Sequence, residues 1–399
     1  MITINSYIHR SLLCDIIRRW MFNELRAADG DSVTRLVHFN SAYVSRYLDR
    51  FSREILEALY GKGLASRPVS LKGDLKDALI AHPPYRNARI DELVRDYRDN
   101  PGRFYRETPF HGTLYFREEE GGARYLASSR IKRVRRLAEK GARRIVDQIF
   151  RNIREQAALL AEERARYLGI PRSHLVTSPE DMQAEFLRAE NRILEDLKNR
   201  KPLVGMGAPV INDVAGVKII MESGDQERLK EVLTAGERFD IVEEEKHKGR
   251  YNATNFIVRY TPPKKEIAGI PLGNDVLRFL SARGWNGGKV NDAFREFIVT
   301  GEQSVHIEII VSTYQETLES EIGRSMHEDR ILEQRMSRQY RGPLAANVEY
   351  LMEYLFLFPY SRQKEIRELP IRIWNRYLPD YFDEVIKNLF RIPVAGILA

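Results

Sequence analysis

The sequence predicts an α+β fold in which a mixed β-sheet is flanked by helical N-terminal and C-terminal regions. Two apolar runs rich in β-branched residues, 210–221 and 305–311, have the composition of buried strands. Between them, residues 223–236 begin with a serine, carry apolar residues at helical spacing and end at a glycine, as a short helix does. Residues 1–100 and 344–399 show mainly helical periodicity, so we expect helices on either side of the sheet.

The composition indicates a globular protein of two or three domains, because 43% of the 399 residues are hydrophobic and 30% are charged. No apolar run approaches the ~20 residues that a membrane span needs, and the first residues lack the charged and apolar parts of an export signal. We therefore expect a cytoplasmic protein with no membrane partner. The single cysteine, Cys14, excludes an internal disulfide and a zinc site built on cysteine pairs. The formal net charge of +7 favours polyanionic partners such as nucleotides or RNA.

The chain divides into four predicted regions: a mainly helical 1–127, a basic helical connector 128–177, the sheet domain 178–330 and an aromatic-rich helical 331–399. In the first region we expect helices over 11–26 and 32–60, the second ending at Gly61, and a β-hairpin across Gly121 and Gly122. The last region is expected to pack in a core or to join copies of the chain in a homo-oligomer.

A long basic helix is predicted to start at Ser128 as its N-cap. One face of this helix is apolar, and cations cover the rest from Arg130 to Arg144: Arg130, Lys132, Arg133, Arg135, Arg136, Lys140, Arg143 and Arg144. Such a stripe can follow an RNA backbone or the phosphates of a nucleotide. A solvated helix face balanced by acidic neighbours is the favoured alternative, and the run lacks the aromatic residues that stack on single-stranded bases.

Ser178, Pro179 and Asp181 form a strong helix start, with serine at the N-cap, proline at the first helical position and an acid at the third. The residues expected to point inward from this helix are Met182, Phe186, Ile193, Leu194 and Leu197. Three cations on this helix, which precedes the next strand, are candidate phosphate ligands: Arg188, Arg192 and Lys198.

Beyond residue 236, alternation predicts strands over 239–243 and 251–260. Three cations cluster in the turn between these strands, where a nucleotide could use them: Lys246, Lys248 and Arg250. Residues 261–301 are predicted to be rich in loops, with one short helix over 275–283.

Asp213 and Glu308 are the candidate catalytic and metal-binding residues. Asp213 stands at the start of the first apolar run, and Glu308 lies within the second, where alternation places it on one face with His306 and Ile310. A carboxylate on each of two strands is a common way to hold a divalent metal and a triphosphate. The alternative for Glu308 is a glutamate that faces water from an edge strand.

Four segments resemble the synthetase domain of RelA/SpoT-type alarmone synthetases over roughly residues 181–327. They are Asp213-Val-Ala-Gly-Val-Lys-Ile219, Tyr251 with the strand after it, Glu308-Ile-Ile-Val-Ser-Thr313 and Ser320-Glu-Ile-Gly-Arg-Ser-Met-His327. They look like that family's Asp-Ile-Ala-Gly-Ile-Arg-Ile, Gly-Tyr-x-Ser-Leu-His, Glu-Ile-Gln-Ile-Arg-Thr and Ala-Glu-x-Gly-x-Ala-x-His motifs. The resemblance implies a nucleotidyltransferase-like sheet domain.

The activity that the resemblance implies is magnesium-dependent transfer of pyrophosphate from ATP to the 3′-hydroxyl of a guanosine nucleotide. Asp213 would hold the metal, and Glu308 would serve as a metal ligand or as general base. Tyr251 would stack on the acceptor base, and Arg188 would contact the ATP phosphates. Further nucleotide-binding candidates on the matched segments are Lys218, Asn255 and His327.

The chain also departs from the family motifs in the residues that hold the substrates. Glu190 stands where a phosphate-binding lysine belongs, Ala253 and Asn255 replace Ser and His, and Ile310 and Ser312 replace Gln and Arg. The sequence therefore predicts a diverged transferase acting on a nucleotide or an RNA 3′-hydroxyl. The alternative is a nucleotide- or RNA-binding regulator that kept the fold and lost the chemistry, and a purely structural oligomerisation protein is the third possibility.

Overall fold

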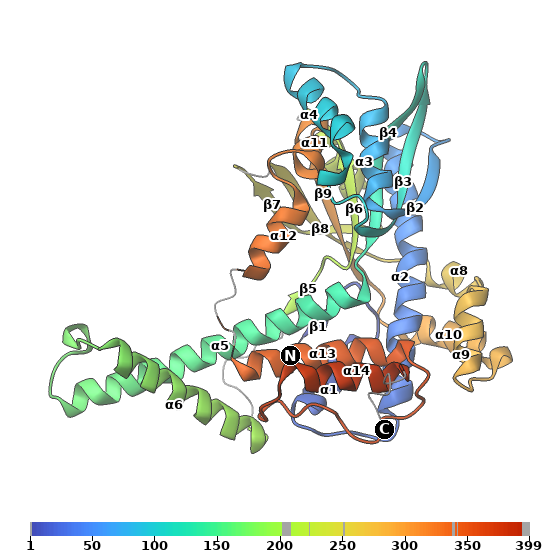
Figure 1. Ribbon diagram of the computed structural model, residues 1–399. Coiled ribbons are helices and arrows are strands. Elements are labelled where there is room, and N and C mark those ends of the chain that lie inside the picture. The colour runs from blue at the N-terminus through green and yellow to red at the C-terminus, as the bar shows by residue number, and fades with distance from the viewer. Residues whose placement is uncertain are drawn as a thin grey trace, which may run out of the picture.

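The computed structural model describes residues 2–201, 209–222, 224–249, 252–336, 340 and 342–392. Among them, seven strands form one mixed sheet in the order β2-β3-β4-β6-β9-β8-β7 (Figure 1). The bounds are β2 Ala65–Leu71, β3 Pro109–Glu119, β4 Gly122–Ile131, β6 Ala215–Ile220, β7 Phe239–His247, β8 Ala253–Tyr260 and β9 Val305–Ser312. The predicted mixed sheet with helical regions around it is confirmed.

Glu308 lies on β9, whereas Asp213, expected on a strand, lies two residues before the start of β6, the neighbour of β9 at the centre of this sheet. β6 and β9 pair in parallel, whereas the other neighbouring strands of this sheet pair antiparallel. Parallel neighbours need a long crossover connection, and here it contains α7 (Gln226–Ala235), the β7–β8 hairpin and three further helices. The sequence signals for α7 and this hairpin are confirmed, although the expected start of α7 at Ser223 lies outside the described residues.

The apolar face of the sheet packs against α2 (Asp29–Tyr60), the long helix that ends at Gly61 as predicted. Gly61 has φ of 89°, a left-handed conformation that favours glycine and stops the helix. Val217 and Ile219 of β6 and Ile307 of β9 are buried on this side. The opposite faces of β6 and β9 are therefore the ones left for polar residues.

The remaining helices gather below and beside the sheet (Figure 1). They are α1 Arg10–Met21, α3 Lys72–Ala81, α4 Ala88–Asp99, α5 Val134–Tyr167, α6 Pro179–Lys198, α11 Tyr314–Ile322, α12 His327–Met336, α13 Pro343–Leu357 and α14 Pro379–Phe390. α13 packs on α5 and contributes Leu351, Leu355 and Phe356 to the main core. In the described part of the chain, no helix is long and apolar enough to cross a membrane.

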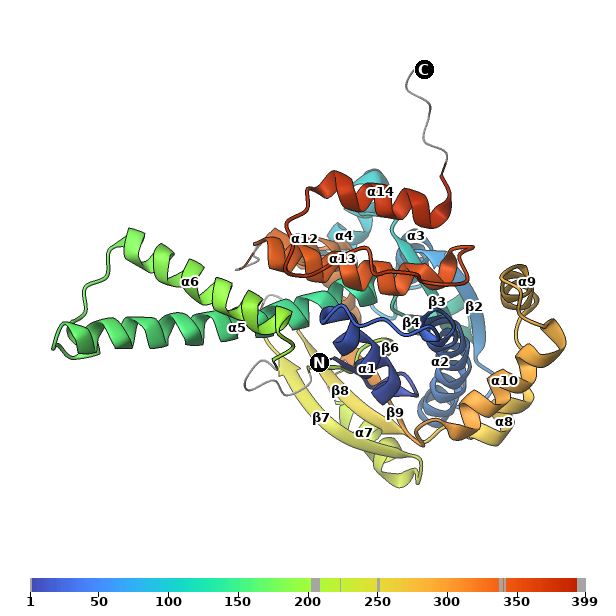
Figure 2. The ribbon, with the colours of Figure 1, turned by 90° about the horizontal axis from the view of Figure 1, so that it is seen from below.

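Helices α5 and α6 form an antiparallel arm that projects from the body in both views (Figures 1 and 2). The predicted start of α6 is confirmed, because the Ser178 hydroxyl accepts a hydrogen bond from the Asp181 amide at 3.0 Å. Ile193 and Leu197 are buried as expected, and Phe186 is partly buried. Met182 is 55% exposed, so its expected inward orientation is wrong: it lies in the first turn of α6.

Three expected boundaries differ from the structure. The first helix, expected over 11–26, ends at Met21. Ser128 does not cap a helix, because it lies within β4 and pairs with Lys218 of β6, and α5 begins only at Val134. Arg130 is therefore a strand residue rather than part of a basic helix. The segment 261–301 contains more helix than expected: α8 Lys264–Gly269, α9 Asn274–Ala282 and α10 Gly287–Thr300. Val290, Phe294 and Ile298 of α10 are buried at helical spacing.

The N-terminal residues are tied to the strand entrance that precedes Asp213. β1 (Thr3–Ile4) pairs in parallel with β5 (Val210–Ile211). The Asn5 amide donates to the Asn212 side chain at 2.8 Å, and the Ser6 hydroxyl donates to the His306 carbonyl at 2.8 Å. These contacts join the chain start to β9 and to Asn212, the residue next to Asp213, just before β6 begins.

Candidate functional site

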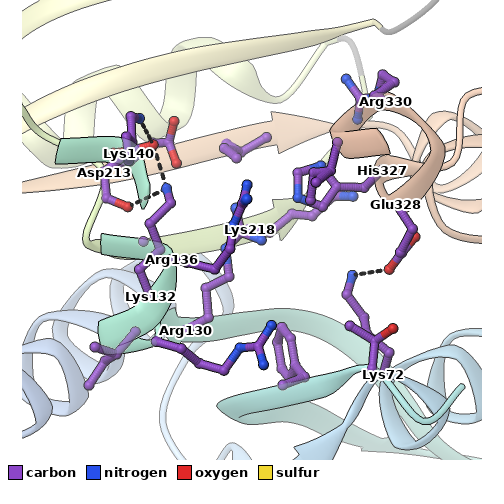
Figure 3. Close-up of a pocket in the computed structure, with 18 of the residues that line it drawn as sticks. Lys72, Arg130, Lys132, Arg136, Lys140, Asp213, Lys218, His327, Glu328 and Arg330 are labelled. Carbon is purple, nitrogen blue, oxygen red and sulfur yellow. Dashed lines mark hydrogen bonds and ion pairs between the residues drawn. The ribbon is translucent and has the colours of Figure 1, made fainter. Parts of the chain in front are cut away.

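A cavity of about 670 Å³ lies over the polar face of the sheet, between the strands, α5 and α12. Its floor comes from β4, β6, β9 and β8, and the start of α3 closes one side. Figure 3 shows Asp213, Lys132 and Lys140 on one side of this space and Lys72 and Glu328 on the other. The cavity thus joins residues that are far apart in the sequence.

The strand register arranges the floor in two rows. Arg130 of β4, Gly216 of β6 and Glu308 of β9 are paired across the sheet in the first row. In the second, Ser128 pairs with Lys218, Lys218 with Ile310, and Ile310 with Asn255 of β8. Since side chains two residues apart share a face of a sheet, both rows point into the cavity.

Gly216 leaves the centre of the first row without a side chain. A Cβ atom at this position would lie 3.6 Å from Oε2 of Glu308. The carboxylate of Glu308 therefore lies beside the bare backbone of β6, with Arg130 on the other side of the glycine. A ligand can approach the sheet most closely at this point.

Asp213, which precedes β6, accepts hydrogen bonds from two lysines of other segments. Lys132 donates to its Oδ2 at 2.5 Å and to its backbone carbonyl at 2.9 Å, and Lys140 of α5 also donates to Oδ2. Burial opposes ionisation of Asp213, but the two ammonium groups outweigh burial and hold its pKa well below the usual carboxyl value. Its other oxygen, Oδ1, is buried and has no hydrogen-bond partner.

Glu308 differs from Asp213 in its electrostatic surroundings. Burial, and next the negative charge of Asp213, raise the pKa of Glu308 above the usual value. Both carboxylates line the cavity, and the negative charge of one opposes ionisation of the other. The buried free oxygen of Asp213 and the Glu308 carboxylate are suitable Mg²⁺ ligands. Within the described residues no group of three or more protein ligands surrounds a metal position, so water and phosphate oxygens would have to complete the shell.

The cavity lining is strongly cationic. Among the described residues, eleven lysines and arginines line it, against six carboxylates. Four of these cations form no ion pair within the described chain: Arg130, Arg133, Arg143 and Arg144. Unpaired cations around one cavity favour a ligand that carries several negative charges.

A buried ion cluster forms the side of the cavity opposite Asp213. Lys72 pairs with Glu321 at 2.7 Å and with Glu328 of α12 at 3.6 Å, and Lys218 lies 3.5 Å from Glu321. Burial lowers the pKa of Lys218 to about 8, with Glu321 opposing the shift. Burial also lowers the pKa of His327, whose ring is therefore neutral at neutral pH.

α12 connects this cluster to α5 across the cavity. Arg335 at its end forms two hydrogen bonds with Glu139 of α5, at 3.0 and 2.9 Å. Burial would raise the pKa of Glu139, but Arg335 and Arg136 outweigh burial and lower it to about 2. α12 is therefore bound to both walls.

The structure brings together five of the candidate residues from the sequence: Asp213, Lys218, Asn255, Glu308 and His327 all line the cavity. The side-chain oxygen of Asn255 is buried and has no hydrogen-bond partner. Five others do not line it: Arg188, Arg192 and Lys198 are exposed on α6, and Lys246 and Lys248 are exposed at the β7–β8 turn. Arg250 and Tyr251 lie outside the described residues.

Sequence reasoning missed the residues that contact Asp213 and the far wall. Lys132 and Lys140 were grouped with a helical stripe, although each donates to one carboxylate. Lys72 belongs to a region without a recognised motif, and its buried pairing with Glu321 spans 249 residues. The one available signal was the unusual density of cations between residues 130 and 144.

The chain matches no family model, and no curated protein or solved structure is significantly similar to it. The likeness to alarmone synthetases therefore depends on the four sequence segments alone.

Proposed function

We propose that the cavity binds nucleotide polyphosphate with Mg²⁺ and transfers pyrophosphate from ATP to the 3′-hydroxyl of a nucleotide or an RNA. The observation that supports this most is the carboxylate pair within a cationic cavity: Glu308 lies on β9, and Asp213 lies two residues before β6, the parallel neighbour of β9. Phosphoryl transfer depends on positioning and charge stabilisation, which cations around the phosphates and carboxylates at the metal supply. Mg²⁺, held by Asp213 and Glu308, would neutralise charge on the reacting phosphates.

In the proposed reaction the acceptor hydroxyl oxygen forms a bond to the β-phosphorus of ATP. The bond from that phosphorus to the oxygen bridging the α-phosphate breaks, and AMP leaves with the electron pair. In its alternative role, as general base rather than metal ligand, Glu308 would take the hydroxyl proton, and its raised pKa would make it a better base than an ordinary glutamate. Arg130, beside it in the same row of the floor, would bind phosphate oxygens.

A second candidate is a nucleotide- or RNA-binding regulator without turnover. The contacts of Lys132 and Lys140 with Asp213 favour it, because ammonium groups occupy one side of the carboxylate that would hold metal. Ser312, where the family motif has arginine, is buried and hydrogen-bonded to Thr317 at 2.8 Å. It therefore has no role in holding a substrate.

Two macromolecular partners belong to the same proposal. RNA would contact the exposed arginines at the cavity rim on or next to α5: Arg133, Arg143 and Arg144. A homo-oligomer would use the C-terminal helices, where Leu378 is 74% exposed and Tyr381 is 43% exposed.

The test is incubation of the protein with Mg²⁺, γ-labelled ATP and separate acceptors: GDP, GTP, ADP, ATP and bulk tRNA. We expect label to move to one acceptor class and to be lost, by a factor of at least 100, in Glu308→Gln, which keeps the shape but cannot take the proton. Glu243→Gln on β7, outside the cavity, is the matched control and should retain activity. Label that stays on ATP while nucleotide binds would support the regulator.

A further inference from the structure

The two carboxylate oxygens of Asp213 have different surroundings. Both ammonium groups, of Lys132 and Lys140, donate to Oδ2, whereas the buried Oδ1 has no partner. Lys132 reaches Asp213 from the segment after β4, and Lys140 comes from the second turn of α5. Two separate elements thus place positive charge on one side of the same carboxylate.

We propose that Lys132 and Lys140 are polyphosphate ligands that, without nucleotide, occupy Asp213 in place of a divalent cation. The site would then take metal only together with a polyphosphate. This inference rests on the proposed function, because it assigns an order of binding to the same cavity. It adds two binding residues that the sequence motifs do not contain.

Charge balance supports this order of binding. Asp213 and Glu308 carry at most two negative charges, and Lys132 and Lys140 cancel them, with Arg130 adding a further positive charge. A free divalent cation at Oδ1 would meet the repulsion of nearby ammonium groups, which is strong in a partly desolvated site. A polyphosphate reverses this balance, because its negative charges attract both the lysines and the metal.

The surroundings also let the lysines change partner. Their side chains retain 18% and 30% exposure and line the cavity together with Arg136. A lysine is a point charge on a flexible four-carbon stem, so its ammonium group can turn to a phosphate without movement of the backbone. A purely structural ion pair needs neither an adjacent cavity nor a second lysine on the same oxygen.

The experiment uses Mn²⁺ as a paramagnetic probe of the metal position, measured by the loss of the free-ion EPR signal. For the full-length protein we expect negligible Mn²⁺ binding alone and, with the β,γ-imido analogue of ATP, one protein-bound Mn²⁺ beyond the Mn²⁺ that the same analogue concentration holds without protein. Lys132→Met with Lys140→Met should increase Mn²⁺ affinity without nucleotide at least tenfold, because Asp213 is then free. The same variant should bind the metal-free analogue at least tenfold more weakly in calorimetry.

The matched control is Arg133→Met with Arg143→Met, which removes two lining cations that do not contact Asp213. This variant should lose analogue affinity without gaining Mn²⁺ binding. If the double variant does not fold, Lys140→Met alone takes its place. This variant removes only the more exposed lysine, so its gain in Mn²⁺ affinity should be smaller.

Two outcomes would overturn the inference while leaving the proposed function intact. One is wild-type protein that binds Mn²⁺ equally well with and without the analogue. The other is a folded Lys140→Met or double variant with no gain in Mn²⁺ affinity. If wild-type protein binds no analogue at all, with or without Mn²⁺, the proposed function itself fails.

Discussion

Lys218 is a partly buried cation on β6, and we expect its charge state to affect how strongly the cavity attracts an anion. Its ammonium group faces Glu321 at 3.5 Å and Ser320 at 3.4 Å, with Lys72 and Arg130 also nearby. Burial lowers its pKa to about 8. As pH rises from 7 to 9, Lys218 loses its proton, so we expect the affinity for metal-free ATP to fall. Calorimetry at pH 7, 8 and 9 measures this fall.

Lys218→Arg provides the control for this pH dependence, because a guanidinium stays protonated at pH 9. The variant should retain more affinity at pH 9 than the wild type, by about threefold or more, with the rest of the fall coming from Lys132, whose pKa burial also lowers to about 8. An identical pH profile in the two proteins would contradict the role of Lys218.

At the residue level, the sequence predicted the part of the site that lies on strands β6 and β9. Gly216 and Lys218 lie two residues apart on a strand, and Glu308 belongs to a clear alternating run, so a local pattern decides which face they share. Lys132 could not be found in this way. Its partner Asp213 is 81 residues away, and only the β4–β6 pairing brings them together.

Individual elements differ in whether their cations reach the cavity, and α5 and α6 provide the clearest comparison. Arg133, Arg143 and Arg144 lie exposed at the cavity rim on or next to α5, whereas Arg188, Arg192 and Lys198 lie exposed on α6, outside the lining. Replacing the α5 set with glutamine should weaken polyphosphate binding about tenfold, because exposed charge contacts contribute roughly 0.2–1 kcal/mol each. Replacing the α6 set should leave it within about twofold. Calorimetry with ATP analogues compares the two variants.

Both triple variants remove the same charge, so a difference between them reports position rather than net charge. Equal losses of affinity would mean that long-range attraction dominates, and the loss would then decrease with added salt in both. A larger loss in the α6 variant would contradict the arrangement of the arm and support the original assignment of Arg188, Arg192 and Lys198.

The strand β4 shows why one element was assigned incorrectly from the sequence. Its cavity face carries Ser128 and Arg130, polar residues that a buried strand lacks but a ligand-facing floor allows. The apolar spacing of Ala138, Ile145 and Ile149 correctly indicated a helix, and all three are buried on α5. Nothing local marked the six-residue difference between the expected N-cap, Ser128, and the true start at Val134, because cations stand on both sides of that boundary.

At the scale of the whole molecule, the sheet crosses the boundaries that composition suggested. β2, β3 and most of β4 belong to the region expected to be mainly helical, yet they continue the same sheet as β6 and β9. The boundary near residue 127 falls inside β4. Pairing between β4 and β6 is antiparallel and joins segments separated by the whole α5–α6 arm. Such non-local pairing leaves no periodic signal in the sequence.

This organisation predicts that residues 178–330 do not fold alone, although they contain both carboxylates and all four motif segments. Without β4, the central strand β6 becomes an edge strand, and without α2 the buried residues Val217, Ile219 and Ile307 lose their apolar cover. Exposed edges and apolar faces of this kind lead to aggregation rather than a stable sheet.

We therefore expect the 178–330 fragment to show no cooperative thermal unfolding and to bind a hydrophobic dye, measured by calorimetry and fluorescence. A chain that lacks only the arm tip, residues 161–183 replaced by a short glycine linker, serves as the control. It should unfold cooperatively like the full chain, because the sheet and α2 are intact and the lining residues remain. A fragment with a sharp transition and nucleotide affinity would instead establish 178–330 as an independent domain and make the N-terminal strands an accessory to the site.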